Sequence, residues 1–191
     1  MVKVLGLMGS PRIDGNIEAS LRESLKAAEE AGADTEMVRL IEKRLETCYG
    51  CKACQATGAC RLDDDFIEVF DKLRAADAVI IASPSYSESI TAPLKALMDR
   101  AAYYNIMALN RSAFTGKPGG AIAVTARTGA ATVWSQVIIF LLSHRFIVPG
   151  IASIPNTVGT EKGDVLNDAE GLEKVRELGR AVTELAMKLK A

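Results

Sequence analysis

The residues with the clearest chemical potential are the four cysteines of the chain, which lie in one segment as Cys48-x2-Cys51-x2-Cys54-x5-Cys60. Two-residue spacers let successive thiolates converge on one metal centre, and three close cysteines joined by a fourth resemble the spacing of bacterial four-iron, four-sulfur sites. The last spacer is longer than in that pattern, and Arg61 rather than proline follows Cys60. The spacing therefore favours a 4Fe-4S cluster and leaves open an all-thiolate zinc site or metal-free thiols used in disulfide chemistry.

A second candidate is the loop from Gly9 to Asn16, which follows the first apolar run and leads directly into a helical pattern. Glycines let backbone N–H groups converge on an anion, and Ser10 and Asn16 offer side-chain donors beside a helix N-terminus. The loop lacks the three-glycine dinucleotide pattern and the Gly-Lys-Ser/Thr ending of nucleoside triphosphatases. It therefore predicts a site for a monophosphate, with a Ser-Pro turn and Asn16 as helix N-cap as the structural alternative.

Two further polar loops, residues 82–95 and 124–131, follow apolar runs. In the first, a planar heterocycle would find Tyr86 to pack on and the backbone amides of residues 84–87 to bond its ring edge. Thr91 is expected to cap the next helix, with Pro93 in its first turn. The second loop, residues 124–131, is small and polar, and its Arg127 would serve a flavin carbonyl or the phosphate of a nicotinamide donor, or be a solvated charge.

The elements that must position these loops alternate in type along the chain. Apolar runs predict strands at about 2–8, 35–40, 77–83, 120–126 and 146–153, and helical spacing predicts helices at 16–31, 64–75, 91–107, 131–144 and 170–190. This alternation indicates an α/β doubly wound parallel sheet of order 2-1-3-4-5, with helices on both faces. Ligands bind outside the carboxyl ends of the first and third strands in that order, and the cysteine segment is expected beside the phosphate loop.

Composition restricts the class of protein. With 191 residues, 49% hydrophobic and 25% charged, the chain is expected to form one globular domain, 1–191, with a cysteine-rich loop at 47–61. A net charge of −1 without a basic stripe argues against nucleic acid as a partner. The most apolar region, 133–148, is interrupted by polar residues, and the N-terminus reads as a strand rather than a signal peptide. We therefore expect no membrane contact and a reducing, cytoplasmic location.

The remaining polar candidates have structural interpretations. Asp63, Asp64 and Asp65 precede a predicted helix, where carboxylates satisfy free N–H groups and complement the helix dipole. His144 is the only histidine and lies in an apolar segment, which is typical of a structural residue. No side chain is predicted to act as a catalytic acid or base.

Taken together, Gly9-Ser10-Pro11-Arg12…Gly15-Asn16, the cysteine run, Asp63-Asp64-Asp65 and Ser83-Pro84-Ser85-Tyr86…Lys95…Asp99-Arg100 resemble the iron–sulfur flavoprotein family, within the NADPH-dependent FMN reductase group. The resemblance spans essentially the whole chain, and the cysteine run is its most specific part. It implies a flavodoxin-like fold, bound FMN, and a 4Fe-4S cluster on Cys48, Cys51, Cys54 and Cys60. The expected FMN-binding residues are Ser10, Arg12, Gly15, Asn16, Ile17, Pro84, Ser85, Tyr86, Ser87, Thr125, Arg127 and Gly129.

The expected function is electron transfer in which FMN exchanges two electrons overall and the cluster passes one at a time. Redox partners would be a ferredoxin or NAD(P)H. The resemblance also implies a homodimer or homotetramer in which subunits complete each other's flavin sites, and the apolar helix after residue 131 fits such an interface. The alternatives are an NAD(P)H-dependent FMN or quinone reductase without a cluster, and a non-enzymatic zinc or phosphate-binding module.

Overall fold

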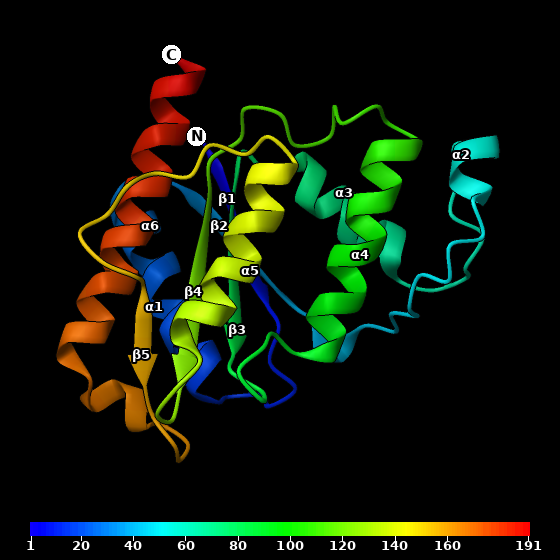
Figure 1. The fold of residues 1–191 in the computed structure, drawn as a ribbon. Coiled ribbons are helices and arrows are strands. Elements are labelled where there is room, and N and C mark those ends of the chain that lie inside the picture. The colour runs from blue at the N-terminus through cyan, green and yellow to red at the C-terminus, as the bar shows by residue number, and fades with distance from the viewer.

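The computed structural model describes all residues from 1 to 191 and contains one five-stranded sheet in the order β2-β1-β3-β4-β5 (Figure 1). Every neighbouring pair of strands is parallel. The strands are β1 (Lys3–Met8), β2 (Asp34–Arg39), β3 (Ala78–Pro84), β4 (Gly119–Thr125) and β5 (Asn156–Val158). The predicted doubly wound topology is confirmed.

Helices cover both faces of the sheet, as predicted. On one face lie α1 (Asn16–Glu30) and α6 (Ala169–Lys190); on the other lie α3 (Phe66–Ala75), α4 (Ala92–Met107) and α5 (Ala130–Ser143) (Figure 1). Each face has its own hydrophobic core, because β1, β3 and β4 direct alternate buried side chains to the two helical layers. These two helical layers hold the strands in place. The loops that follow the strand ends are the ones that could bind a ligand.

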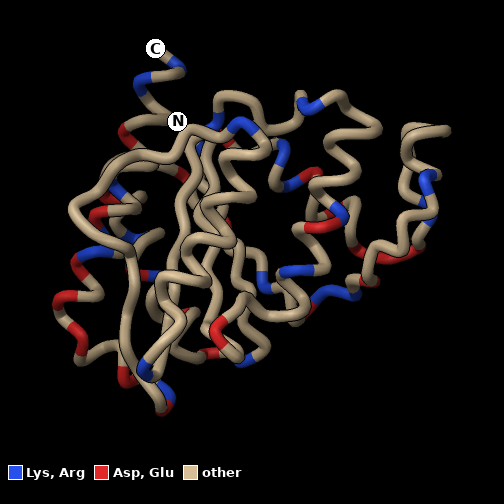
Figure 2. Tube along the Cα trace, viewed as in Figure 1, with Lys and Arg blue, Asp and Glu red and all other residues tan.

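Three short helices were not predicted. These are α2 (Ala53–Thr57) within the cysteine segment and the 3-10 turns η1 (Leu40–Glu42) and η2 (Asp164–Asn167). None of the helices combines the length and the apolar character that crossing a membrane requires. Acidic and basic residues are interspersed along the chain (Figure 2), in keeping with the net charge of −1.

The predicted position of the fifth strand is wrong. Within 146–153 only Ile147 pairs with the sheet, through a bridge to Pro118, and the pairing resumes at Pro155, whose carbonyl accepts from Ala123 N–H. Pro149 has no N–H to donate to a ladder, which accounts for the interruption. The true β5 is a short polar edge strand in which Thr157 is buried and its hydroxyl lies 2.7 Å from that of Ser20.

Candidate functional site

A cavity of about 480 Å³ lies beyond the carboxyl ends of β1, β3, β4 and β5. This is the switch point of the sheet, where doubly wound folds bind ligands, and the volume is in the range of small-molecule sites. Residues predicted from the sequence supply much of its lining: Ser10, Arg12, Gly15, Asn16, Ile17, Pro84, Ser85, Tyr86 and Thr125. The predicted residues Ser87, Arg127 and Gly129 do not line it.

The loop before α1 is shaped to receive an anion. The Ser10 hydroxyl is buried and accepts a hydrogen bond from Arg12 N–H at 3.1 Å, which folds the loop back on itself. Gly15 occupies the N-cap position of α1, and no side chain caps the helix. The N–H groups of the first turn are therefore left for a ligand, with the helix dipole directed at it.

The alternative interpretation of Asn16 as a helix N-cap is wrong. Its side chain instead donates to the carbonyl of Glu161 at 2.8 Å and accepts from Gly163 N–H at 2.8 Å. Both ends of the amide are therefore used to hold the loop after β5 against the start of α1. This loop is the part of the site that the sequence interpretation missed.

The loop after β5 contributes Gly159, Thr160 and Lys162 to the cavity. The Nζ of Lys162 lies 3.7 Å from the Asp14 carboxylate, and both side chains are exposed. Lys162 thus brings a cation to the same end of the cavity as the phosphate loop. The sequence signal for this contribution is a polar, glycine-containing stretch that follows the predicted fifth strand, because the carboxyl ends of the strands share one edge of the sheet.

The buried carboxylate of Glu18 holds the phosphate loop in place. Glu18 is only 1% exposed; it accepts from Asp14 N–H at 2.9 Å and pairs with Arg39 at 2.6 Å and Arg22 at 2.7 Å. The hydrogen bond from Arg39 is the largest influence and outweighs burial, so that the pKa of Glu18 is lowered to about 2. The carboxylate thereby ties the loop to the end of β2.

The opposite wall of the cavity is a tight turn after β3. Tyr86 and Ser89 exchange both backbone hydrogen bonds, and Ser87 and Glu88 between them have positive φ of 49° and 59°. Left-handed backbone is unfavourable for residues with a Cβ, so this turn is held against local preference. The Tyr86 side chain remains 43% exposed at the cavity, where a planar ligand would meet it.

Two contacts place this wall relative to its neighbours. Gly129 has φ of +92°, and a Cβ there would lie 2.1 Å from the Ser85 hydroxyl oxygen, so the loop after β4 packs directly on Ser85. Thr91 occupies the N-cap position of α4 without capping it, and its hydroxyl donates to the carbonyl of Gly9. The predicted side-chain cap at Thr91 is therefore wrong, because the hydroxyl ties α4 to the phosphate loop.

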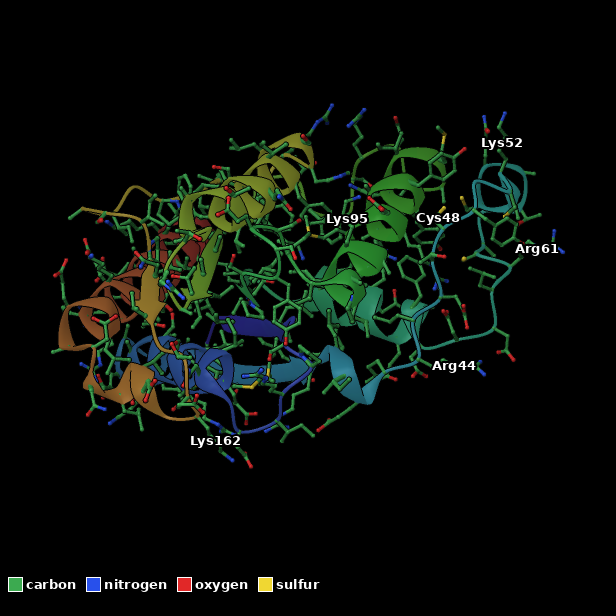
Figure 3. All side chains as sticks on the ribbon, turned by 60° about the horizontal axis from the view of Figure 1, so that its bottom comes forward. Arg44, Cys48, Lys52, Arg61, Lys95 and Lys162 are labelled. Carbon is green, nitrogen blue, oxygen red and sulfur yellow. The ribbon has the colours of Figure 1, made fainter.

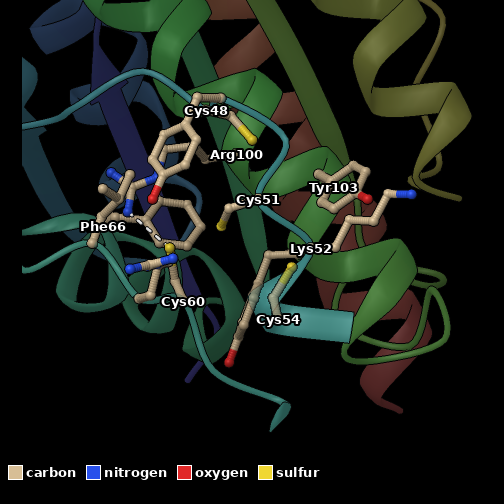
Figure 4. A pocket seen from close by; sticks show the side chains of 12 residues that line it. Cys48, Cys51, Lys52, Cys54, Cys60, Phe66, Arg100 and Tyr103 are labelled. Carbon is tan, nitrogen blue, oxygen red and sulfur yellow. Dashed lines mark hydrogen bonds between the residues drawn. The ribbon is translucent and has the colours of Figure 1, made fainter. Parts of the chain in front are cut away.

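All four cysteines line a second, smaller cavity of about 30 Å³ (Figure 4). Each is a free thiol, with Cys54 buried and Cys48 and Cys51 exposed. Burial is the main reason that the pKa of Cys54 is raised. No three cysteine, histidine or acidic side chains in the structure come close enough together to share a metal ion. The segment thus gathers its thiols around one space without bringing them to a common point.

The two ends of the cysteine segment are fastened together by the aspartates that follow it. Asp64 accepts from Glu46 N–H at 2.7 Å, and Asp65 accepts from Arg44 N–H at 2.7 Å. The prediction that these carboxylates serve the start of α3 holds only for a 3.2 Å bond from Phe66 N–H to Asp64, since Asp65 provides no side-chain cap. Their main hydrogen bonds join residues 44–46 to residues 64–65 and so connect the two ends of the cysteine segment.

Arg100, on α4, contacts these joined ends of the cysteine segment from the protein interior. Its guanidinium forms a buried ion pair with Asp64, lies 4.2 Å from the centre of the Phe66 ring and donates to the Cys60 sulfur at 3.2 Å. Burial opposes its charge, but the contacts with Asp64 and Cys60 prevail and raise the pKa of Arg100. Figure 4 shows the hydrogen bond between Arg100 and Cys60 at the edge of the cysteine cavity.

Comparisons with known proteins identify the family of the chain. The model of the family described as NADPH-dependent FMN reductase matches residues 2–159. An iron-sulfur flavoprotein of Methanocaldococcus jannaschii is 40% identical, with 99% of this chain and 100% of the relative covered. One from Methanosarcina thermophila is 31% identical, with 96% and 95% covered. The chain belongs to the iron-sulfur flavoprotein family, within the NADPH-dependent FMN reductases. It is therefore a flavin-dependent oxidoreductase.

Solved structures show the fold of this iron-sulfur flavoprotein. RosB with a bound 8-demethyl-8-formylriboflavin-5'-phosphate matches with a TM-score of 0.76 at 20% identity, covering 100% of this chain and 81% of RosB. FerB, an NAD(P)H:(acceptor) oxidoreductase of Paracoccus denitrificans, matches with a TM-score of 0.70 at 18% identity, with 98% of each chain covered. A flavodoxin from the Archaea matches with a TM-score of 0.64 at 13% identity, covering 98% and 99%. The fold is flavodoxin-like, as predicted.

The two sites of this iron-sulfur flavoprotein are farther apart than the strand order suggests. The cavities share no lining residue, and α2 lies outside the layer formed by α3 and α4 (Figure 1). Figure 3 shows Cys48, Lys52 and Arg61 at one end of the molecule and Lys162 at the other. The expectation that the cysteine segment lies beside the phosphate loop is wrong, because the chain after β2 turns away along the outside of α4.

His144 is structural, as its apolar setting indicates. Its ring Nδ1 lies 3.1 Å from the Asn105 amide nitrogen, and burial lowers its pKa. The ring packs between Asn105 of α4 and Phe140 of α5 and lines neither cavity.

Proposed function

We propose that the protein is an electron-transfer flavoprotein that holds FMN at the sheet edge and a 4Fe-4S cluster on Cys48, Cys51, Cys54 and Cys60, coupling two-electron to one-electron chemistry. The observation that carries the proposal is a single chain with two separate cavities: one has a free helix N-terminus for a phosphate, and the other is lined by four free thiols. Flavin supplies two-electron chemistry when bound, and a cluster supplies one-electron transfer.

The larger cavity fits FMN. The uncapped start of α1, the Ser10 loop and Lys162 would hold the phosphate, and the free N–H groups provide donors that no protein group uses. Residues 84–86 and Thr125 would border the ring, with the Tyr86 turn held rigid by its paired backbone hydrogen bonds. The chain's role there is to bind and orient; no carboxylate, histidine or cysteine lines the cavity.

The cysteine cavity fits a cluster in the chemistry of its donors. An all-thiol set in one segment is the ligand set of iron–sulfur clusters, and the buried Nε of Arg100 beside it has no partner in the protein. The cavity of about 30 Å³ has to widen to admit a cluster. Residues 44–52, which carry Cys48 and Cys51, have no regular secondary structure and are mostly exposed, so the loop can spread outward.

Assembly and redox partners complete the proposal. On α5 the side chains of Ile139 and Leu142 are 63% and 57% exposed, which is an apolar surface suited to a second copy of the chain. A homodimer or homotetramer would bring the cysteine segment of one subunit toward the flavin of another, whereas the two cavities of one chain are separated. NAD(P)H or a ferredoxin would be the redox partner.

The test is an absorption spectrum of anaerobically purified protein with iron and acid-labile sulfide assayed on the same sample. We expect flavin bands over a broad brown shoulder and about four iron and four sulfide per chain. A Cys48→Ser/Cys51→Ser variant should lose the iron and keep the flavin. Flavin without iron, after anaerobic reconstitution, would instead identify a cluster-free FMN or quinone reductase, and a colourless protein would indicate a zinc or phosphate-binding module.

A further inference from the structure

We infer that Arg100 is a positioning residue that raises the reduction potential of the cysteine-bound cluster by donating a hydrogen bond to the Cys60 sulfur. The inference rests on the proposed function, because it concerns the cluster placed there. It goes beyond ligand identity, since it assigns the tuning of the cluster to one cation on α4.

The geometry singles out one sulfur. Arg100 is 3% exposed, and its Nη2 lies 3.2 Å from the Cys60 sulfur. Of the four cysteine sulfurs, Cys60 is the one that accepts a hydrogen bond from a side chain. The donor comes from α4, a helix outside the cysteine segment, and is also held by Asp64 and Phe66.

The guanidinium is held in place by three other contacts. It pairs with the buried Asp64 carboxylate, donates to the Glu46 carbonyl at 3.2 Å and lies over the Phe66 ring. These contacts use Nη1 and the face of the group and leave Nη2 directed at sulfur. Asp64 in turn binds the loop through Glu46 N–H, so the arginine and the two ends of the segment form one unit.

One N–H donor of Arg100 has no acceptor within the protein. The Nε of Arg100 is buried and has no hydrogen-bond partner. A buried charged donor without an acceptor is costly, and arginine normally uses its several N–H groups where it is enclosed. An inorganic sulfide or a displaced thiolate in the adjoining cavity would supply the missing acceptor.

The direction of the effect follows from charge. Reduction adds one electron to the cluster, supplied in the assay by dithionite, and no covalent bond forms or breaks. A cation at hydrogen-bond distance, screened from water, stabilises the more negative reduced form more than the oxidised form. Asp64 offsets part of the positive charge, but the carboxylate lies on Nη1 and the N–H of Nη2 still faces sulfur.

The decisive experiment is an anaerobic redox titration of the holoprotein followed by electron paramagnetic resonance. Removing Arg100 alone leaves the Asp64 carboxylate buried and unpaired, so Arg100→Met/Asp64→Asn is compared with Asp64→Asn. We expect the double variant to lower the equilibrium constant for one-electron reduction about tenfold, a shift of 59 mV. Arg61→Met removes a cation from an exposed position at the same cavity and should shift the potential much less.

A second measurement keeps the inference testable if the double variant does not retain its cluster. Wild-type protein labelled with 15N in the arginine guanidinium groups should show hyperfine coupling from guanidinium nitrogen in pulsed electron paramagnetic resonance of the reduced cluster. Iron and sulfide at the expected content, with no 15N coupling or an unchanged potential, would overturn the role of Arg100 and leave the proposed function standing. A wild-type protein that binds no iron would remove both.

Discussion

The buried carboxylate of Glu18 offers the sharpest quantitative test of the structure. The prediction concerns Glu18→Gln, which keeps an oxygen able to accept the Asp14 N–H but removes the charge that pairs with Arg39 and Arg22. This carboxylate links Asp14, in the loop before α1, to Arg39 at the end of β2. Its loss should therefore weaken both the fold and the anion site.

The magnitude follows from the pKa. The pKa of Glu18 falls from the ordinary 4.5 to about 2, and each pKa unit is equivalent to 1.36 kcal/mol, so ionised Glu18 stabilises the fold by about 3 kcal/mol at pH 7. Because the pKa is depressed, this contribution is fully present above pH 4.5 and is lost as pH falls toward 2. At pH 3 linkage leaves about 1.4 kcal/mol.

Urea denaturation of wild type and Glu18→Gln at pH 7 and pH 3 measures both values. The difference in free energy of unfolding should be about 3 kcal/mol at pH 7 and should shrink by about half at pH 3. Glu42→Gln is the matched control, since Glu42 meets the same Arg39 at 3.6 Å from an exposed position and should change stability by less than about 1 kcal/mol. A Glu18→Gln effect no larger than that of Glu42→Gln, or one independent of pH, would refute the reasoning.

Three further predictions concern the larger cavity. Gly129→Ala forces a Cβ onto the Ser85 hydroxyl at positive φ and should weaken FMN binding by about tenfold, or 1–2 kcal/mol, in a fluorescence titration of apoprotein; unchanged affinity would show that this packing does not shape the site. Lys162→Met should weaken FMN binding about twofold to fivefold and leave riboflavin binding unchanged, because only FMN carries the phosphate; equal losses for both ligands would contradict a phosphate contact. Glu88→Gly should raise the free energy of unfolding by about 1 kcal/mol by relieving left-handed backbone, whereas destabilisation would show that the Glu88 side chain supports the turn.

The elements that the sequence predicted well are those whose burial leaves a strong local pattern. β1, β3 and β4 are buried along almost their whole length, so each is a continuous apolar run, and their ends fall within a residue or two of the predicted ones. The edge strand β5 has no such pattern, because it is short and its central Thr157 is stabilised by a hydroxyl of α1. The more apolar stretch at 146–153 carries the pattern of a strand instead.

The errors at the site have a common cause in long-range contacts. Asn16 and Thr91 both have sequence contexts typical of helix caps, yet each side chain bonds a distant loop. Asp64 likewise precedes a helix, but its strongest partners are Arg100 and the backbone of Glu46. Local preference sets the residue type at these positions, and tertiary neighbours decide which partner the side chain takes.

Helix α4 is the physical link between the two cavities within one chain. Its N-cap residue Thr91 ties it to the phosphate loop through the hydroxyl, and Arg100 contacts Cys60 about two and a half turns later. One turn farther on, the Tyr104 hydroxyl donates to the Gly58 carbonyl at 3.0 Å. At 1.5 Å per residue, Thr91 and Arg100 are about 14 Å apart along the axis. A single rigid helix therefore sets the spacing between flavin edge and cysteine segment, whereas the strand order alone would have placed them side by side. In the proposed function, a second subunit packed on the exposed apolar side chains of α5 would offer a shorter path between the two cavities than a single chain does.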